Sequence, residues 1–225
     1  MRFREIRSCE DMHSLILDVG FLPLFKNHIE GFSIEECTPR ELWFSDEVEG
    51  PWEWKGPCIQ MGDVVYGKFM GNKACFIRKD IFTEFANYRR NGYDFDALYD
   101  DGMAPLKDKK VFDIIYDHGT IMTKELKEIG NYKKGGNKGF ETIITRLQMQ
   151  TYVCVANFER MRNKKGEEYG WGIARYTTPE YLFGDDLMVE AYKHEPEESK
   201  EIVREYLRKL LPDASYNQII RVSGQ

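Results

Sequence analysis

Two glutamines near the middle of the chain, Gln148 and Gln150, carry side chains whose spacing bears on possible chemistry. A side-chain amide both donates and accepts hydrogen bonds, so it can position a water molecule or contact the edge of an adenine base. Residues two apart in an α-helix do not share a face, so the two amides converge only if Gln150 lies beyond the helix end. The alternative is that both are simply polar residues at a helix end.

Basic side chains gather in two places close to these glutamines. The first group lies at a glycine-rich turn where a helix is expected to begin, a position that suits phosphate contacts: Lys133, Lys134 and Lys138. Arg146 lies about two turns further along the same helix, on its more polar side. The second group surrounds a turn between two predicted strands and suits phosphates or a minor groove: Arg160, Arg162, Lys164 and Lys165. The alternative for both groups is solvated charge on a domain that binds protein.

The distribution of charge singles out the same segment. The whole chain has 32 basic and 38 acidic residues and a net charge of −6, which is not typical of a nucleic-acid-binding protein. Residues 104–180 contain 14 basic and 10 acidic residues, whereas the segments before and after them are acidic. We therefore expect double-stranded DNA as the partner of this segment, and the oligomeric state stays open.

The predicted elements of this segment follow the order of a known DNA-binding domain. Apolar residues recur with a helical period over 105–118 and 138–150, and a short helix is predicted over 123–130. Two strand patterns follow, joined by a basic turn at 163–166. Three helices followed by a two-stranded hairpin is the order of a winged helix-turn-helix domain.

The rest of the chain is expected to flank this domain. We predict an α+β fold with a mixed α/β N-terminal part over 1–103, the winged helix over 104–180 and a helical C-terminal tail over 181–225. The N-terminal part is expected to contain a helix capped by Ser8, a hairpin over 64–77 and a helix over 80–90. Thr38 is expected to cap another helix, and residues 50–57 to form a loop. A helix over 197–211 is expected in the tail.

Two groups of side chains between residues 50 and 102 have both a functional and a structural interpretation. Clustered aspartates suit a hard cation, but their spacing does not match a calcium-binding loop, so helix capping and pairing with Arg89 and Arg90 are favoured: Asp94, Asp96, Asp100 and Asp101. Clustered aromatic side chains suit stacking on an extruded base, but a place in the core is favoured: Trp52, Trp54, Tyr66, Tyr88, Tyr93 and Tyr99.

Several classes of protein are excluded by the sequence. It has no run of about 18 apolar residues that would cross a membrane, and no apolar segment typical of a signal peptide. Its five cysteines form no C-x-x-C pair, which argues against a disulfide scaffold and a zinc site. Phosphate-loop and nucleophile-elbow motifs are also missing. We therefore expect a cytoplasmic protein without a membrane partner, a metal or a cofactor.

Five blocks of the sequence, within residues 21–184, resemble a group of bacterial proteins related to the AlkZ-type DNA glycosylases: GPWEWKGP, YGKFMGNKACFI, FANYRRNGYDFDALYDDG, KGFETIITRLQMQTYV and GEEYGWGIARYTTPE. The resemblance implies a fold built from winged helices and cleavage of the glycosidic bond of alkylated bases without metal or cofactor. The catalytic motif of those enzymes is glutamine, an apolar residue, then glutamine or aspartate, which Gln148-Met149-Gln150 matches. In those enzymes the motif lies near the N-terminus of a longer chain, whereas here it ends a helix in mid-chain.

Three functions follow from these patterns, in order of preference. The first is a DNA-binding winged-helix protein related to AlkZ-type glycosylases, with catalysis left open. The second is a non-catalytic module for protein recognition or self-association. The third is a glycosylase, in which Gln148 and Gln150 would position and polarise a water molecule while Asp94 or Asp96 stabilises the oxocarbenium charge.

Overall fold

The structure is a computed structural model that describes residues 3–43, 47–163, 165–189 and 191–224. Six strands lie within these residues: β1 (Phe21–Pro23), β2 (Val64–Met70), β3 (Lys73–Arg78), β4 (Thr120–Met122), β5 (Cys154–Arg162) and β6 (Glu168–Thr177). The α-helices of the same residues are α1 (Cys9–Val19), α2 (Ile34–Cys37), α3 (Pro51–Gln60), α4 (Lys79–Arg90), α5 (Phe95–Asp100), α6 (Leu106–His118), α7 (Thr123–Ile129), α8 (Phe140–Met149), α9 (Pro179–Phe183), α10 (Pro196–Leu210) and α11 (Tyr216–Ser223). The fold therefore mixes helices and strands, as predicted.

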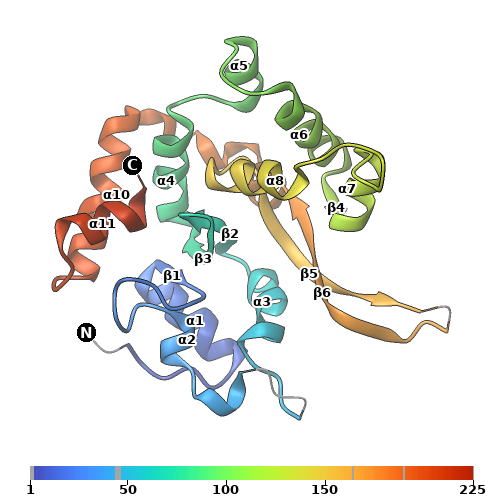
Figure 1. The fold of residues 1–225 in the computed structure, drawn as a ribbon. Coiled ribbons are helices and arrows are strands. Elements are labelled where there is room, and N and C mark those ends of the chain that lie inside the picture. Colours follow the sequence, from blue (N-terminus) through green and yellow to red (C-terminus); the bar gives the residue numbers. More distant parts are fainter. Residues whose placement is uncertain (1–2, 44–46, 164, 190, 225) are drawn as a thin grey trace.

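The strands of the described residues form one antiparallel sheet in the order β1-β3-β2-β5-β6-β4. The two halves of this sheet meet at a single register pair, Tyr66 of β2 with Val155 of β5. Beyond this junction, β5 and β6 continue as a long hairpin that projects from the rest of the molecule (Figure 1). The sheet thus crosses the expected boundary at residue 103, and the division of the chain into three parts stays a prediction.

The elements between residues 104 and 180 follow the predicted order with one addition. Helices α6, α7 and α8 correspond to the three predicted helices, and β5 and β6 to the two predicted strands. The apolar face of α8 is buried as predicted, because four residues are each at most 5% exposed: Phe140, Ile143, Ile144 and Leu147. The addition is β4, a short strand between α6 and α7 that pairs with β6.

Local signals in the N-terminal part are confirmed as well. The backbone N–H of Asp11 donates to the Ser8 hydroxyl at 3.1 Å, which caps α1, and Gly20 ends this helix at a φ of 69°. Strands β2 and β3 turn at Gly71 and Asn72, and both residues have the positive φ that such a tight turn requires.

The expected loop at 50–57 is wrong, because α3 occupies this segment. Gly50 is the N-cap, Pro51 is the first helical residue, and the backbone N–H of Gly50 donates to Glu53 at 3.1 Å. Proline is favoured at the first position of a helix. Gly56 is needed for close packing, since a Cβ there would lie 2.7 Å from Oδ1 of Asn157 in β5. The glycines and the first proline therefore mark a helix start and a helix–strand contact.

The predicted helix cap at Thr38 is wrong too. Its hydroxyl donates to the Ile34 carbonyl at 2.8 Å, so Thr38 ends α2. The next residues, Arg40–Leu42, form only a 3-10 turn that has no side-chain cap. A threonine can satisfy a carbonyl behind it as readily as an amide ahead of it, and the sequence alone does not separate these cases.

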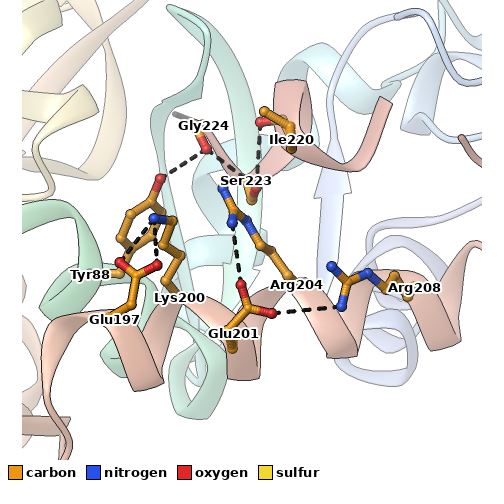
Figure 2. Close-up of polar contacts among 9 residues, drawn as sticks. All are labelled: Tyr88, Glu197, Lys200, Glu201, Arg204, Arg208, Ile220, Ser223 and Gly224. Carbon is orange, nitrogen blue, oxygen red and sulfur yellow. Dashed lines mark hydrogen bonds and ion pairs between the residues drawn. The ribbon is translucent and has the colours of Figure 1, made fainter. Parts of the chain in front are cut away.

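The C-terminal helices pack against α4. In a buried contact, Asn87 Nδ2 donates to Ser199 Oγ at 2.8 Å, and the Tyr88 hydroxyl donates to the Gly224 carbonyl at 2.8 Å. Glu201 of α10 pairs with two arginines of the same helix, Arg204 and Arg208 (Figure 2). The predicted helix at 197–211 is confirmed as α10, and it packs against α4.

Candidate nucleic-acid interface

Three exposed lysines surround the start of α8: Lys133, Lys134 and Lys138. The loop that carries them is held by Asn137, whose Nδ2 donates to the Gly130 carbonyl at 2.9 Å and whose N–H donates to the Asn131 carbonyl at 2.7 Å. Tyr132 packs on Phe140 with ring centroids 5.3 Å apart. The loop thus places three cations beside a helix N-terminus, where the unpaired N–H groups also attract anions.

Arg146 of α8 is bound to another helix. Its Nε and Nη2 donate to the two carboxylate oxygens of Asp108 in α6 at 2.5 and 2.6 Å. The Asp108 side chain is 1% exposed, whereas that of Arg146 is 40% exposed. Such a bidentate pair holds α6 against α8, and a DNA contact by Arg146 stays a prediction.

The four predicted cations of the β5–β6 turn differ in their surroundings. Arg160 is exposed and forms no ion pair with the described residues, and Lys165 is also exposed. Arg162 pairs with Glu168 across the hairpin at 3.1 Å. Lys164 lies outside the described residues. Arg160 and Lys165 are therefore the members of this group that the structure places free for a ligand.

The two glutamines lie in different environments. Gln148 is 2% exposed, its Oε1 accepts from the Lys68 N–H at 3.1 Å, and its Nε2 donates to the Ile144 carbonyl at 3.1 Å. The Lys68 N–H is freed by a register irregularity in β2. Gln150 is half-buried and ends α8. Gln148 thus joins α8 to the sheet, and the catalytic assignment of the pair stays a prediction.

Replacing Gln148 with alanine is expected to lower the free energy of unfolding by about 1–3 kcal/mol, because the Lys68 N–H would be buried without an acceptor. Gln150→Ala is the matched control and is expected to change stability by less than about 1 kcal/mol, since that amide is partly solvated. Urea unfolding of the two variants measures the difference. Equal midpoints for the two would contradict the bridging role of Gln148.

A pocket of about 350 Å³ with acidic and aromatic walls lies beyond the end of α8. Its carboxylates are Asp94, Asp96, Asp113, Glu180 and Asp185, and its rings are Phe95, Phe112, Tyr116, Tyr152 and Tyr192. Arg90 also lines the pocket, but its charge is already paired with Glu180 at 2.5 Å. The glutamines are not among the lining residues. Aromatic faces together with carboxylates suit an organic cation.

The aspartates of this region have structural partners, and the predicted helix capping is confirmed for Asp94. Asp94 caps α5 by accepting from the Ala97 N–H at 2.8 Å, and Asp96 pairs with Lys109 at 3.1 Å. The predicted pairing with Arg89 and Arg90 is wrong, because Arg90 binds Glu180 and Arg89 donates to the carbonyl of Phe69. Within the described residues, no histidine, cysteine and carboxylate groups gather as metal ligands.

The sequence patterns did not single out Trp171, which lines a second pocket between α3 and the β5–β6 hairpin, or Lys55, which lies against an aromatic ring of the same pocket. Trp171 is 61% exposed although it lies within a strand, and Lys55 is 3% exposed although it carries a charge. The ammonium of Lys55 lies 3.4 Å from the ring centroid of Trp52. A lysine next to two tryptophans is a recognisable cation–π signal, but the expectation of a loop at 50–57 concealed it.

The comparisons with known proteins place this structure in a family. A family model described as AlkZ related matches residues 6–224. No curated protein and no solved structure matches the chain. No helix of the described part of the chain is long and apolar enough to cross a membrane. Since the match takes in both halves of the sheet and the C-terminal helices, the chain belongs to the AlkZ-related family, as its five sequence blocks predicted.

Proposed function

We propose that this protein binds double-stranded DNA through a winged helix formed by α6, β4, α7, α8, β5 and β6. The order of these elements supports the proposal, as does the pairing of β4 with β6 beside a long β5–β6 hairpin. In a winged helix the third helix enters the major groove and the hairpin contacts the flanking backbone. Helix α8 would therefore read the DNA, and the hairpin would be the wing.

The observation that carries the proposal is the group of lysines at the start of α8. Lys133, Lys134 and Lys138 are exposed, and none of them forms an ion pair with the described residues. Their charges add to the field of the helix N-terminus, which makes the start of α8 a favourable place for a phosphate. Arg160 and Lys165 supply two further unpaired cations on the wing.

The proposal is tested with a variant that carries Lys133→Ala, Lys134→Ala and Lys138→Ala. Binding to a short labelled duplex is measured by fluorescence anisotropy between about 50 and 200 mM salt. Each phosphate contact contributes about 0.9 to the slope of log K against log salt, so the triple variant is expected to lower the slope by about 2 to 3.

The matched control removes three exposed cations elsewhere, through Lys73→Ala, Lys209→Ala and Arg221→Ala. This control is expected to keep the wild-type slope. An unchanged slope in the α8 variant would contradict the assignment of these lysines. Absence of duplex binding by the wild-type protein at low salt would instead favour the second function, a protein-recognition or self-association module.

Base excision is a second candidate function, and the acidic and aromatic pocket favours it. A base alkylated on a ring nitrogen is an aromatic cation, which matches a pocket of carboxylates and rings. Family membership supports the same reaction class. The amide oxygen and the amide nitrogen of Gln148 each already form a hydrogen bond within the protein. Asp94 and Gln150 are more exposed, so they are better placed than Gln148 to meet solvent or substrate. Release of the free base from methylated DNA is the measurement that tests whether the protein excises bases.

A further inference from the structure

Lys68 of β2 differs from its neighbours in the strand, because it is half-buried whereas the other six residues of β2 are buried. It belongs to the N-terminal half of the sheet, outside the elements of the proposed winged helix. Strand β2 nevertheless packs beside α8, the helix that is proposed to read DNA (Figure 1). A lysine in an otherwise buried strand must bring its ammonium group to water or to a partner.

A β-bulge orients Lys68 towards α8. The β2–β3 register shifts between Gly67 and Met70, so that β2 contains one more residue than β3 over this stretch. The backbone N–H of Lys68 donates to Oε1 of Gln148 in α8 at 3.1 Å. Bulges redirect neighbouring side chains, and this hydrogen bond fixes the bulge against the helix. The position of Lys68 beside α8 is therefore set by the backbone as well as by its side chain.

The ammonium group of Lys68 lies at the edge of the outer face of α8. Its Nζ donates to Oγ1 of Thr145 at 3.3 Å. Thr145 is half-buried, and it follows the exposed Thr142 by three residues, so the two threonines share a face of the helix. This is the face of α8 that is open to a ligand, since its apolar residues pack into the core.

The acidic groups along this side of α8 already have cationic partners. Glu141 of α8 pairs with Lys127 at 2.7 Å, and Asp108 of α6 pairs with Arg146 at 2.5 Å. Lys68 forms no ion pair with the described residues, and its only polar contact with α8 through Nζ is the uncharged Thr145 hydroxyl. Its charge is therefore available to an anion that lies along the outer face of α8.

We infer that Lys68 binds a phosphate of the DNA strand that borders α8, so that β2 forms part of the interface. The inference rests on the proposed duplex binding. Thr145 lies five residues beyond Phe140, about 8 Å along the helix axis, so Lys68 and the lysines at the start of α8 contact different phosphates. A phosphate contact fixes the register and orientation of a protein on the duplex without reading its sequence. Lys68 thus holds α8 in position in the groove.

The test replaces Lys68 with methionine, which keeps an apolar stem without the charge. Binding to a short labelled duplex is measured by fluorescence anisotropy between about 50 and 200 mM salt. Loss of one phosphate contact is expected to lower the slope of log K against log salt by about 0.9 and to weaken binding to every sequence alike. Lys68→Arg keeps the charge and is expected to keep the wild-type slope.

Two control variants separate a phosphate contact from an effect on the structure. Thr145→Val removes the hydrogen-bond partner of Lys68 but leaves its charge, so it is expected to keep the wild-type slope. Lys73→Met removes an exposed cation at the other end of the same β2–β3 turn, and it is also expected to keep that slope.

A wild-type slope for Lys68→Met, together with a lowered slope for the triple variant at the start of α8, would overturn this inference alone. An equal loss of slope in Thr145→Val would overturn it as well, because the effect would then come from the lost contact between β2 and α8. The same holds for an equal loss in Lys73→Met. Absence of duplex binding by the wild-type protein at low salt would overturn the proposed duplex binding together with this inference.

Discussion

Replacing Arg90 with methionine is expected to lower the free energy of unfolding by about 3–5 kcal/mol. The Arg90 side chain is 2% exposed, and it donates to Glu180 at 2.5 Å and to the Thr151 carbonyl at 2.8 Å. Thr151 is fully buried and has a φ of 68°, so its carbonyl in the turn between α8 and β5 has no access to water. Methionine fills a similar volume but leaves this carbonyl and the Glu180 carboxylate without their donor.

Denaturant unfolding of Arg90→Met measures this loss, and Arg162→Met is the matched control. Arg162 also pairs with a glutamate, but both side chains are exposed, by 69% and 49%. Such pairs contribute at most about 1 kcal/mol, so the control is expected to unfold close to the wild-type midpoint. Similar small shifts in both variants would show that the Arg90 contacts do not support the turn.

Replacing Lys55 with methionine is expected to stabilise the protein at pH 7 by about 1–3 kcal/mol. Burial lowers the pKa of Lys55 from 10.5 to about 8, although Glu53 opposes the shift. A shift of this size corresponds to about 3 kcal/mol against the charged form, and the attraction to Trp52 that methionine loses is worth about 0.5–2 kcal/mol. Removing the charge of Lys55 is therefore expected to raise the free energy of unfolding.

The lowered pKa of Lys55 also predicts that the stability of the protein depends on pH. Between pH 8 and 10.5 the unfolded chain keeps the proton on Lys55 while the folded protein releases it. Stability that depends on this residue therefore rises with pH through this range, and below pH 8 the full cost is present. The advantage of Lys55→Met over the wild-type protein is expected to be largest at pH 7 and to shrink as the pH approaches 10.

Unfolding of both proteins is measured at several pH values, and the difference in free energy is taken at each. Tyrosines and cysteines that titrate in the same range cancel in this difference. Lys165→Met is the control, because Lys165 is exposed and its replacement is expected to change stability by less than about 0.5 kcal/mol at every pH. A difference that stays constant with pH would contradict the burial of a charged Lys55.

Helical periodicity and capping predicted most elements of the fold. The stripe through Phe140, Ile143, Ile144 and Leu147 identified α8, and the Ser8 cap identified α1. The same local rules failed at residues 50–57, where Gly56 is set by a contact with β5, a strand about a hundred residues further along the chain. Strand β4 was missed because three residues are too few for a period to be recognised.

The candidate site was predictable only where it depends on exposed charge. The composition of a glycine-rich loop with several lysines predicts exposed positive charge, and Lys133, Lys134 and Lys138 are exposed in the structure. Arg146 and Gln148 lie further along in α8, but their side chains form hydrogen bonds with groups of α6 and β2 that are distant in the sequence. A sequence pattern identifies the type of a side chain, whereas its availability depends on which distant groups pack against it.

The register pair between Tyr66 and Val155 places a constraint on how this chain folds. The hairpins β2–β3 and β5–β6 each join neighbouring strands, so they close short loops, whereas the pair between them closes a long one. We therefore expect the two hairpins to form before they dock against each other. Until they dock, β2 and β5 are open edges that carry Val64, Val65 and Val155, and open apolar edges associate between molecules. The interval before docking is thus the stage at which a crowded solution of this chain is most prone to aggregate.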